Sequence, residues 1–286
     1  MNKNPLISII IPCYNASKWI KETIYSVIKQ SYNNWELLII DDGSTDNSAE
    51  IISEFIDIRI KYFYIKNSGV AYARNYGVNK SNGLYLAFLD ADDLFLEDNL
   101  YKKVLFLTNH NFKFVHSDVI IQDNINNNNE IKKSCITNPL KQLLEFSELS
   151  FIPPSNVIMT REIFDEVNGF DINLSTSADW DLWVRIANKT EFGYISEPLI
   201  IYRLYPNQMH KNIELMEKDM LYAFQKLRKS NIFKSKKYFN YCLSKLYLIL
   251  AGSYSKYSNN KLKFIKYLIL SFITNPIWVF KKISIL

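Results

Sequence analysis

Three carboxylates fall within four positions of the chain, at Asp90, Asp92 and Asp93, directly after an apolar run that ends at Leu89. No basic residue stands among them. Carboxylate oxygens are the hard ligands that Mg²⁺ and Mn²⁺ prefer, so a strand that ends in this cluster is a candidate divalent-cation site. If the strand continues through the cluster, Asp90 and Asp92 lie on one side and Asp93 on the other. Taken alone, the six residues 88–93 are equally compatible with a solvated turn after a strand.

A second acidic pair, Asp41 and Asp42, follows the apolar run 36–40, and Gly43 behind it permits a tight turn. Ligands of open α/β sheets bind outside the carboxyl ends of the strands. A carboxylate at that place can accept a hydrogen bond from a base N–H or a ribose hydroxyl. The alternative is that both residues only cap and solvate the turn.

A third acid, Asp179, stands at the start of a predicted helix over 177–186, with Asp181 two positions later. Positions two apart on a helix point about 200° apart, so one carboxylate can face a cleft while the other faces away. A catalytic base at Asp179 needs a pKa raised by burial or by a nearby acid. The ordinary alternative is a first-turn acid stabilised by the helix dipole.

The only basic residue in the predicted helix 69–77 is Arg74. Its guanidinium is always charged, and it can serve a phosphate or pair with one of the acids; the sequence leaves both open. Small residues in the same stretch, Ala71, Ala73 and Gly77, allow the helix to approach a sheet closely.

Continuous apolar runs of strand length predict strands that are buried on both faces of a parallel sheet. Amphipathic or Gly-started stretches between them predict helices. The expected strands are 6–11, 36–40, 60–65 and 84–89, and the expected helices are 16–30, 51–55 and 69–77. Acidic or polar loops follow the first, second and fourth strands, which indicates a doubly wound α/β domain with a nucleotide-sized cleft. Because the chain has neither a GxGxxG fingerprint nor a P-loop lysine, phosphate would be held through a metal.

The length of 286 residues suits one domain over 1–210 followed by a helical extension over 211–286. The extension is rich in Lys and poor in acid, so its apolar stripes either pack on the core or contact an anionic membrane. The lack of an Arg-rich patch with interleaved aromatics argues against nucleic acid. No apolar run is long enough to span a membrane.

The cysteines are odd in number and far apart, which favours a reducing compartment. The first residues read as a strand rather than a signal peptide. Together these features predict a cytoplasmic protein, at the inner face of the cell membrane if the basic extension contacts lipid.

Six motifs occur in a fixed order along residues 6–205: SIIIPCYNA (8–16), DDGSTD (41–46), GVAYARNYG (69–77), FLDADD (88–93), GFD (169–171) and ADWDLWVR (178–185). Their order and spacing resemble family 2 glycosyltransferases of the GT-A fold. The resemblance implies a Rossmann-like, mixed and mainly parallel sheet flanked by helices, with a C-terminal helical extension.

The resemblance also implies a role for each matching residue. The donor site would comprise Pro12, Tyr14, Asn15, Asp41, Asp42, Arg74, Asp90, Ala91 and Asp92. Asp90-Ala91-Asp92 corresponds to the DxD signature, in which Asp92, together with Asp90, would hold Mn²⁺ or Mg²⁺. Asp179 corresponds to the catalytic base.

Two positions depart from the family pattern. Ala178 replaces a common Glu before the catalytic Asp, so that neighbour cannot help to tune the base. Tyr205 stands where relatives often carry a His, which puts a metal or phosphate contact there in doubt; His210 is the nearest alternative.

The implied activity is metal-dependent, inverting transfer of a sugar from a nucleoside-diphosphate sugar, with UDP-sugars as first choice. The implied acceptor is a hydroxyl of a glycan or lipid-linked molecule, contacted by about residues 118–176, in the synthesis of O-antigen, capsule or lipopolysaccharide. One alternative, a nucleotidyltransferase, would need a Gly-rich, Lys-bearing loop that residues 12–18 do not offer. Another, a non-catalytic nucleotide-sugar-binding module, would be expected to lack Asp92 and Asp179, and both are present.

Overall fold

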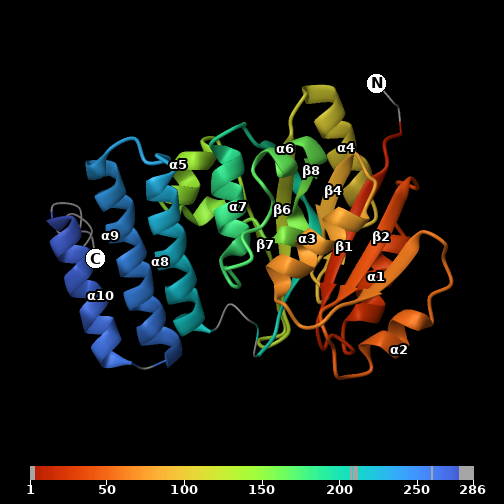
Figure 1. Cartoon of the computed structure of the whole chain (residues 1–286), viewed down its shortest axis with the longest axis horizontal. Coiled ribbons are helices and arrows are strands. Elements are labelled where there is room, and N and C mark those ends of the chain that lie inside the picture. Colours follow the sequence, from red (N-terminus) through yellow and green to blue (C-terminus); the bar gives the residue numbers. More distant parts are fainter. Residues whose placement is uncertain (1–3, 207, 209–211, 259, 277–286) are drawn as a thin grey trace.

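The computed structural model describes residues 4–206, 208, 212–258 and 260–276 (Figure 1). A single mixed sheet runs through its centre, in the order β3-β2-β1-β4-β8-β6-β9-β5, with β7 paired to β6. The first four strands are parallel; β8 is antiparallel to both β4 and β6, and β9 is parallel to β6. The strands are β1 (Ile7–Cys13), β2 (Trp35–Asp41), β3 (Ile60–Tyr64), β4 (Tyr85–Phe88), β5 (Leu94–Phe95), β6 (Phe114–Asp123), β7 (Asn128–Lys132), β8 (Ile158–Thr160) and β9 (Gly193–Leu204).

The apolar runs of β1 and β2 are continuous because both faces of the sheet are covered. Ile9 belongs to one buried cluster and Ile10 to the other, and Leu37 and Leu38 divide in the same way. Helices α1 (Ile20–Ile28), α2 (Ser48–Ser53) and α4 (Asn99–His110) complete the first cluster. Helices α3 (Val70–Lys80), α6 (Arg161–Glu166) and α7 (Ala178–Ala187) complete the second. This alternation confirms the predicted α/β fold, in which helices flank a mixed, mainly parallel sheet.

Helix α3 lies directly against β1, as its small residues predict. A Cβ atom on Gly77 would come within 2.5 Å of Ile10 Cγ2, so only glycine permits this approach. The packing fixes the position of Arg74 relative to the carboxyl ends of the strands.

Several element boundaries differ from the sequence-based expectations near the acidic loops. Helix α1 begins at Ile20 rather than at residue 16, because Ala16 and Ser17 donate their N–H groups to Ser48 Oγ and Asp46 Oδ2 of the next loop. Strand β4 ends at Phe88, before the acidic cluster.

The C-terminal region forms α8 (Ile213–Lys229), α9 (Lys236–Ser253) and α10 (Lys261–Thr274), which lie side by side at one end of the molecule (Figure 1). A short helix, α5 (Pro139–Leu144), packs against α7 beside them. The core continues across this region: Trp180 of α7 and Phe224 of α8 stack with ring centroids 5.5 Å apart. The division at residue 210 stays a prediction. Among the described residues, none of the helices combines the length and apolarity needed to cross a bilayer.

Candidate active site

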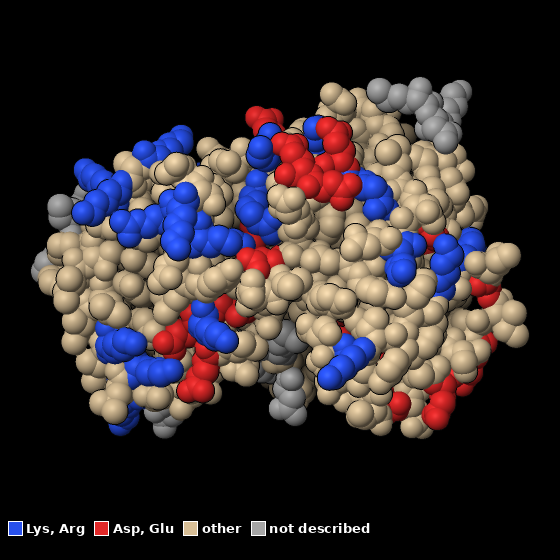
Figure 2. Space-filling model, viewed as in Figure 1, with Lys and Arg blue, Asp and Glu red and all other residues tan. Residues whose placement is uncertain are grey.

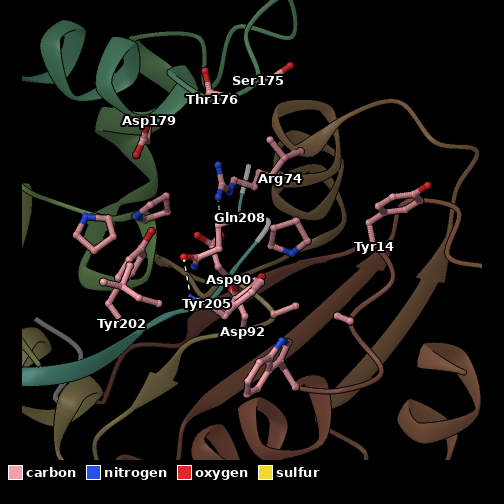
Figure 3. Close-up of a pocket in the computed structure, with 18 of the residues that line it drawn as sticks. Tyr14, Arg74, Asp90, Asp92, Ser175, Thr176, Asp179, Tyr202, Tyr205 and Gln208 are labelled. Carbon is pink, nitrogen blue, oxygen red and sulfur yellow. Dashed lines mark hydrogen bonds and ion pairs between the residues drawn. The ribbon is translucent and has the colours of Figure 1, made fainter. Parts of the chain in front are cut away.

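A cavity of about 1210 Å³ lies at the carboxyl ends of β1, β2 and β4. One side is built from the loops after these strands, and the start of α7 with Asp179 lies across from it (Figure 3). Apolar side chains of α5, α7 and α8 also line this second side: Leu143, Trp180, Trp183 and Met216. The predicted site residues that line it are Pro12, Tyr14, Asn15, Asp42, Arg74, Asp90, Ala91, Asp92 and Asp179. The fold therefore brings residues from five separate sequence segments to one cavity.

Asp41 is the predicted site residue that does not line the cavity. Its carboxylate is buried, where Oδ1 accepts the backbone N–H of Ser44 at 2.7 Å and Oδ2 accepts the Tyr62 hydroxyl at 2.7 Å. Both oxygens are thus used to hold the turn and the edge of the sheet. A donor contact by Asp41 has no support in this geometry.

Asp42 does reach the cavity, and its carboxylate also organises the loop. Oδ1 accepts the N–H of Ser68 at 2.7 Å, and Oδ2 accepts the N–H of Gly69 at 2.8 Å. Burial raises the pKa of Asp42, and these two N–H groups oppose that shift. Each carboxylate oxygen has a further acceptor position for a ligand N–H or hydroxyl.

Asp90 and Asp92 stand in a turn, not in a strand, and the N–H of Asp93 closes that turn on the carbonyl of Asp90 at 3.0 Å. Asp90 Oδ1 forms an ion pair with Arg74 Nη2 at 2.5 Å, and Asp92 Oδ2 accepts the Tyr205 hydroxyl at 2.6 Å. Burial, and then the charge of Asp90, raise the pKa of Asp92. Their side chains face the same cavity (Figure 3).

Asp93 turns away from this pair and is completely buried. Its Oδ2 accepts the hydroxyl of Ser155 at 2.5 Å, and its Oδ1 accepts the N–H of Arg203 at 3.1 Å. Burial, and then the charges of Asp92 and Asp90, raise the pKa of Asp93 well above its ordinary value. Asp93 points away from its neighbours as expected, but because of these partners rather than strand alternation.

Arg74 is only 5% exposed and lies with its guanidinium carbon 5.2 Å from the centre of the Phe170 ring. Within the described part of the chain, its Nε atom has no hydrogen-bond partner. The side chain therefore keeps one donor beyond its ion pair with Asp90. That Nε atom is buried, but the side chain as a whole lines the cavity, so its positive charge can attract an anionic ligand there.

Asp179 lies in the first turn of α7 and faces the cavity from the side opposite Tyr14 (Figure 3). Its Oδ1 accepts the N–H of Trp180 at 2.8 Å. Burial raises the pKa of Asp179 to about 6, against the opposing charge of Arg74. Asp181 points away, as the helical spacing predicts, and pairs with Arg185 and with Lys226 of α8.

Three contributions to the site were not found by sequence reasoning. Tyr205 was singled out as a departure from the family pattern, but its hydrogen bond to Asp92 was not anticipated. Ser155 links the DxD turn to Asp93 by accepting the N–H of Asp90 at 3.1 Å. Asp219 of α8 accepts three successive N–H groups, those of residues 175–177, just before α7. His210 lies outside the described residues.

The residues present suit a metal ion that binds together with its substrate. Among the described residues, no group of three or more carboxylate, His or Cys side chains is arranged so that it could hold a metal ion by itself. Asp90 and Asp92 nevertheless face one cavity, and the charge of Asp90 already raises the pKa of Asp92, so a cation between them would relieve their repulsion. Mg²⁺ and Mn²⁺ sites with one or two protein carboxylates are completed by phosphate oxygens and water.

Residues 8–167 match the family described as Glycosyl transferase family 2. WfgD of Escherichia coli, a UDP-Glc:alpha-D-GlcNAc-diphosphoundecaprenol beta-1,3-glucosyltransferase, is 33% identical over 214 residues, which are 72% of this chain and 80% of WfgD. Three uncharacterized glycosyltransferases of Rickettsia are 35% to 38% identical, but the match spans only about a third of their length (29% to 33%).

Solved structures with the same fold have much lower sequence identity. The S. aureus protein TarS in complex with UDP-GlcNAc has a TM-score of 0.70 at 16% identity, over 94% of this chain and 81% of that one. The mannosyltransferase PcManGT of Pyrobaculum calidifontis, in complex with GDP-Man and Mn²⁺, has a TM-score of 0.61 at 15% identity, over 96% and 88%. The expected resemblance and fold are confirmed: the chain belongs to glycosyl transferase family 2 and has the GT-A fold.

Proposed function

We propose that this chain is an inverting, metal-dependent transferase that moves a sugar from a nucleoside-diphosphate sugar to an acceptor hydroxyl. One observation carries the proposal: Asp179 and the pair Asp90 and Asp92 face one cavity from different sides (Figure 3). An acid with a raised pKa and a pair of cation-binding carboxylates are the two parts that such a displacement requires.

The polar side of the cavity would hold the donor. The ring of Tyr14 is 53% exposed there and offers a face for a nucleobase, and Asp42 offers an acceptor for a base N–H. Pro12, Asn15 and Ala91 complete this side. UDP-sugars are the first choice because WfgD is named for UDP-Glc and TarS was solved with UDP-GlcNAc.

Asp90 and Asp92 would hold Mn²⁺ or Mg²⁺ against the diphosphate of the donor. The bound cation would neutralise the charge that develops on the leaving nucleoside diphosphate. Arg74 supplies a fixed positive charge at the same place, beside Asp90. Because Arg74 lines the cavity, this charge would attract the diphosphate.

Asp179 would act as the general base. Its Oδ1 is bonded to the Trp180 N–H, which leaves Oδ2 to take the proton of the acceptor hydroxyl. The hydroxyl oxygen then forms a bond to the anomeric carbon while the bond to the diphosphate breaks on the opposite face. The electron pair leaves with the diphosphate oxygen, so a single displacement inverts the anomeric centre.

The acceptor would enter from the side of the cavity opposite the donor loops. Apolar and aromatic side chains line this side, including Phe151, Trp180 and Met216. Such a surface suits the ring faces of a glycan or the first part of a lipid-linked acceptor. WfgD is named for a diphosphoundecaprenol-linked acceptor, which supports a lipid-linked acceptor for this chain as well.

A donor screen tests the proposal. Purified protein with Mn²⁺ is incubated with UDP-, GDP- and TDP-sugars, and the release of nucleoside diphosphate is measured. Release of UDP from one UDP-sugar is the expected result. Release of pyrophosphate instead, or no nucleotide product from any donor in the presence of lipid-linked and glycan acceptors, would contradict it.

The rate of transfer is expected to rise with pH through about 6 and to level off above 7. The base must be ionised, and burial together with the Asp90 charge raises the pKa of Asp179 to about 6 against the opposing charge of Arg74. Below pH 6, kcat/KM should therefore fall about tenfold per pH unit. Steady-state kinetics between pH 4.5 and 8.5 measure this, with circular dichroism to exclude acid unfolding. A flat profile from pH 5 to 8 would contradict a base whose pKa is raised to about 6.

Asp219→Asn is expected to lower kcat by about tenfold or more with little change in donor affinity, because small misplacements of catalytic groups are costly. Asp219 is 2% exposed and its Oδ2 accepts the N–H groups of Ser175 and Thr176, both at 2.8 Å. An amide cannot replace that charge-assisted capping, so the start of α7 should shift. Asp165→Asn, at an exposed carboxylate, is the matched control. Equal kcat values for both variants would show that Asp219 is not a positioning residue.

A further inference from the structure

Helix α10 presents a broad apolar face that nothing in the described structure covers. Its exposed large side chains include Leu262, Ile265, Leu268, Ile269 and Ile273, with Leu262 82% and Ile273 69% exposed. At 100° per residue these five fall on one side of the helix. Contiguous apolar surface of this kind marks an interaction site in a soluble protein.

The opposite side of α10 already makes the contacts that hold the helix in the fold. Tyr267 and Ser271 are buried there, and the Ser271 hydroxyl donates to the carbonyl of Ser244 in α9 at 2.8 Å. Lys263 is anchored on Glu217 of α8 at 2.9 Å. The exposed apolar face is therefore additional to what packing requires.

Basic residues outnumber acidic ones in this region of the chain. No Asp or Glu follows Asp219 in the sequence, whereas Lys residues recur through the same region. Lys261 and Lys266 lie on α10 beside these apolar side chains, and neither forms an ion pair within the described residues. Blue side chains outnumber red ones over the end of the molecule formed by α8, α9 and α10, where a smaller red group lies beside them (Figure 2).

We propose that this face of α10 docks the protein on an anionic lipid surface. An apolar face bordered by lysines is the pattern of a helix that lies in the membrane interface, where the lysines reach anionic headgroups. The helix has 14 residues, about 21 Å at 1.5 Å per residue, and so lies on a bilayer rather than crossing it. A second copy docked on the same face would bring lysines against lysines with no acid between them.

Vesicle co-sedimentation tests the docking without any donor or acceptor, so its outcome is independent of the proposed transfer reaction. Vesicles of phosphatidylcholine alone are compared with vesicles containing about 30% phosphatidylglycerol, at low and high salt. Binding to the anionic vesicles, weakened by salt, is the expected result. Lys261→Gln/Lys266→Gln should weaken it by about tenfold or more, since each Lys near the surface contributes about 1 kcal/mol.

The apolar contribution is tested with Leu262→Asp/Ile269→Asp, which should abolish binding while leaving the circular dichroism unchanged. Ile56→Asp/Ile58→Asp is the matched control, because both isoleucines are almost fully exposed and lie outside the C-terminal helices, just after α2. Equal binding by the α10 variant and the control would overturn the proposal. A second outcome would also overturn it. In that outcome the unaltered chain binds no vesicles and light scattering shows that it is a dimer, while the α10 variant is a monomer and the control variant remains a dimer.

Discussion

Asp179→Asn is expected to lower kcat for sugar transfer by about 10³-fold, within the 10²- to 10⁴-fold range of general-base catalysis, while donor affinity changes little. The amide oxygen can still accept the N–H of Trp180, so the start of α7 should keep its geometry. The amide cannot take the acceptor proton at neutral pH. Nucleoside-diphosphate release at saturating donor and acceptor measures the first effect, and calorimetry with the nucleotide sugar measures the second.

Asp181→Asn provides the comparison on the same helix. That carboxylate is fully buried, away from the cavity, and pairs with Lys226 at 2.6 Å and Arg185 at 2.8 Å. Its loss leaves two charges without their partner and should lower Tm much more than it lowers kcat. An Asp179→Asn variant that keeps kcat within tenfold of the unaltered protein would show that the proton goes elsewhere.

The strands of the first half could be predicted because a strand that is buried on both faces needs apolar side chains at nearly every position. In β1 every residue except Pro12 is fully buried or nearly so, and side chains alternate between two separate apolar clusters. An uninterrupted apolar run of strand length is typical of a strand in this position. The order of helices and strands up to β4 followed from the same pattern.

The ends of the elements were less predictable, because local hydrogen bonds decide them. Apolar periodicity runs on from residue 16, yet Ala16 and Ser17 bond to the loop after β2 instead of beginning α1. The distinction between Asp41 and Asp42 has the same origin. Both follow one strand, but only the positions of Ser44 and Tyr62 turn Asp41 away from the cavity.

Contacts between residues far apart in the sequence could not be predicted from a single chain. Asp219 lies more than 40 positions from the loop whose N–H groups it accepts. In the sequence it cannot be distinguished from any other acid on an amphipathic helix. Ser155 follows a Pro-Pro pair, which predicts a break in secondary structure but does not predict that the Ser155 hydroxyl accepts the N–H of Asp90. Tyr205 departs from the family pattern, but the sequence does not predict that its hydroxyl donates a hydrogen bond to Asp92.

The hydrogen bond between Tyr205 and Asp92 bears directly on the metal. Burial and the nearby charge of Asp92 raise the pKa of Tyr205, so the phenol keeps its proton and donates it to Asp92 Oδ2. A phenol of this kind orients the carboxylate but is a poor replacement for an imidazole ligand. Asp92 Oδ1 is then the oxygen that we expect to contact the cation, with Asp90 as the second protein ligand.

Asp92→Ala is accordingly expected to weaken Mn²⁺-dependent binding of the nucleoside-diphosphate donor by about 100-fold or more, since losing even a partner of a metal ligand costs about 10- to 100-fold. Calorimetry with UDP or a UDP-sugar, in Mn²⁺ and in EDTA, measures the difference. Tyr205→Phe is the matched control: it removes the hydroxyl but keeps the carboxylate, so the dependence on Mn²⁺ should persist. In EDTA all three proteins should bind the nucleotide equally weakly, because the base contacts are intact. Unchanged affinity of Asp92→Ala in Mn²⁺ would mean that the cation, if it binds, is held by other groups, and Asp90 and Asp92 would then serve only to place Arg74 and Tyr205.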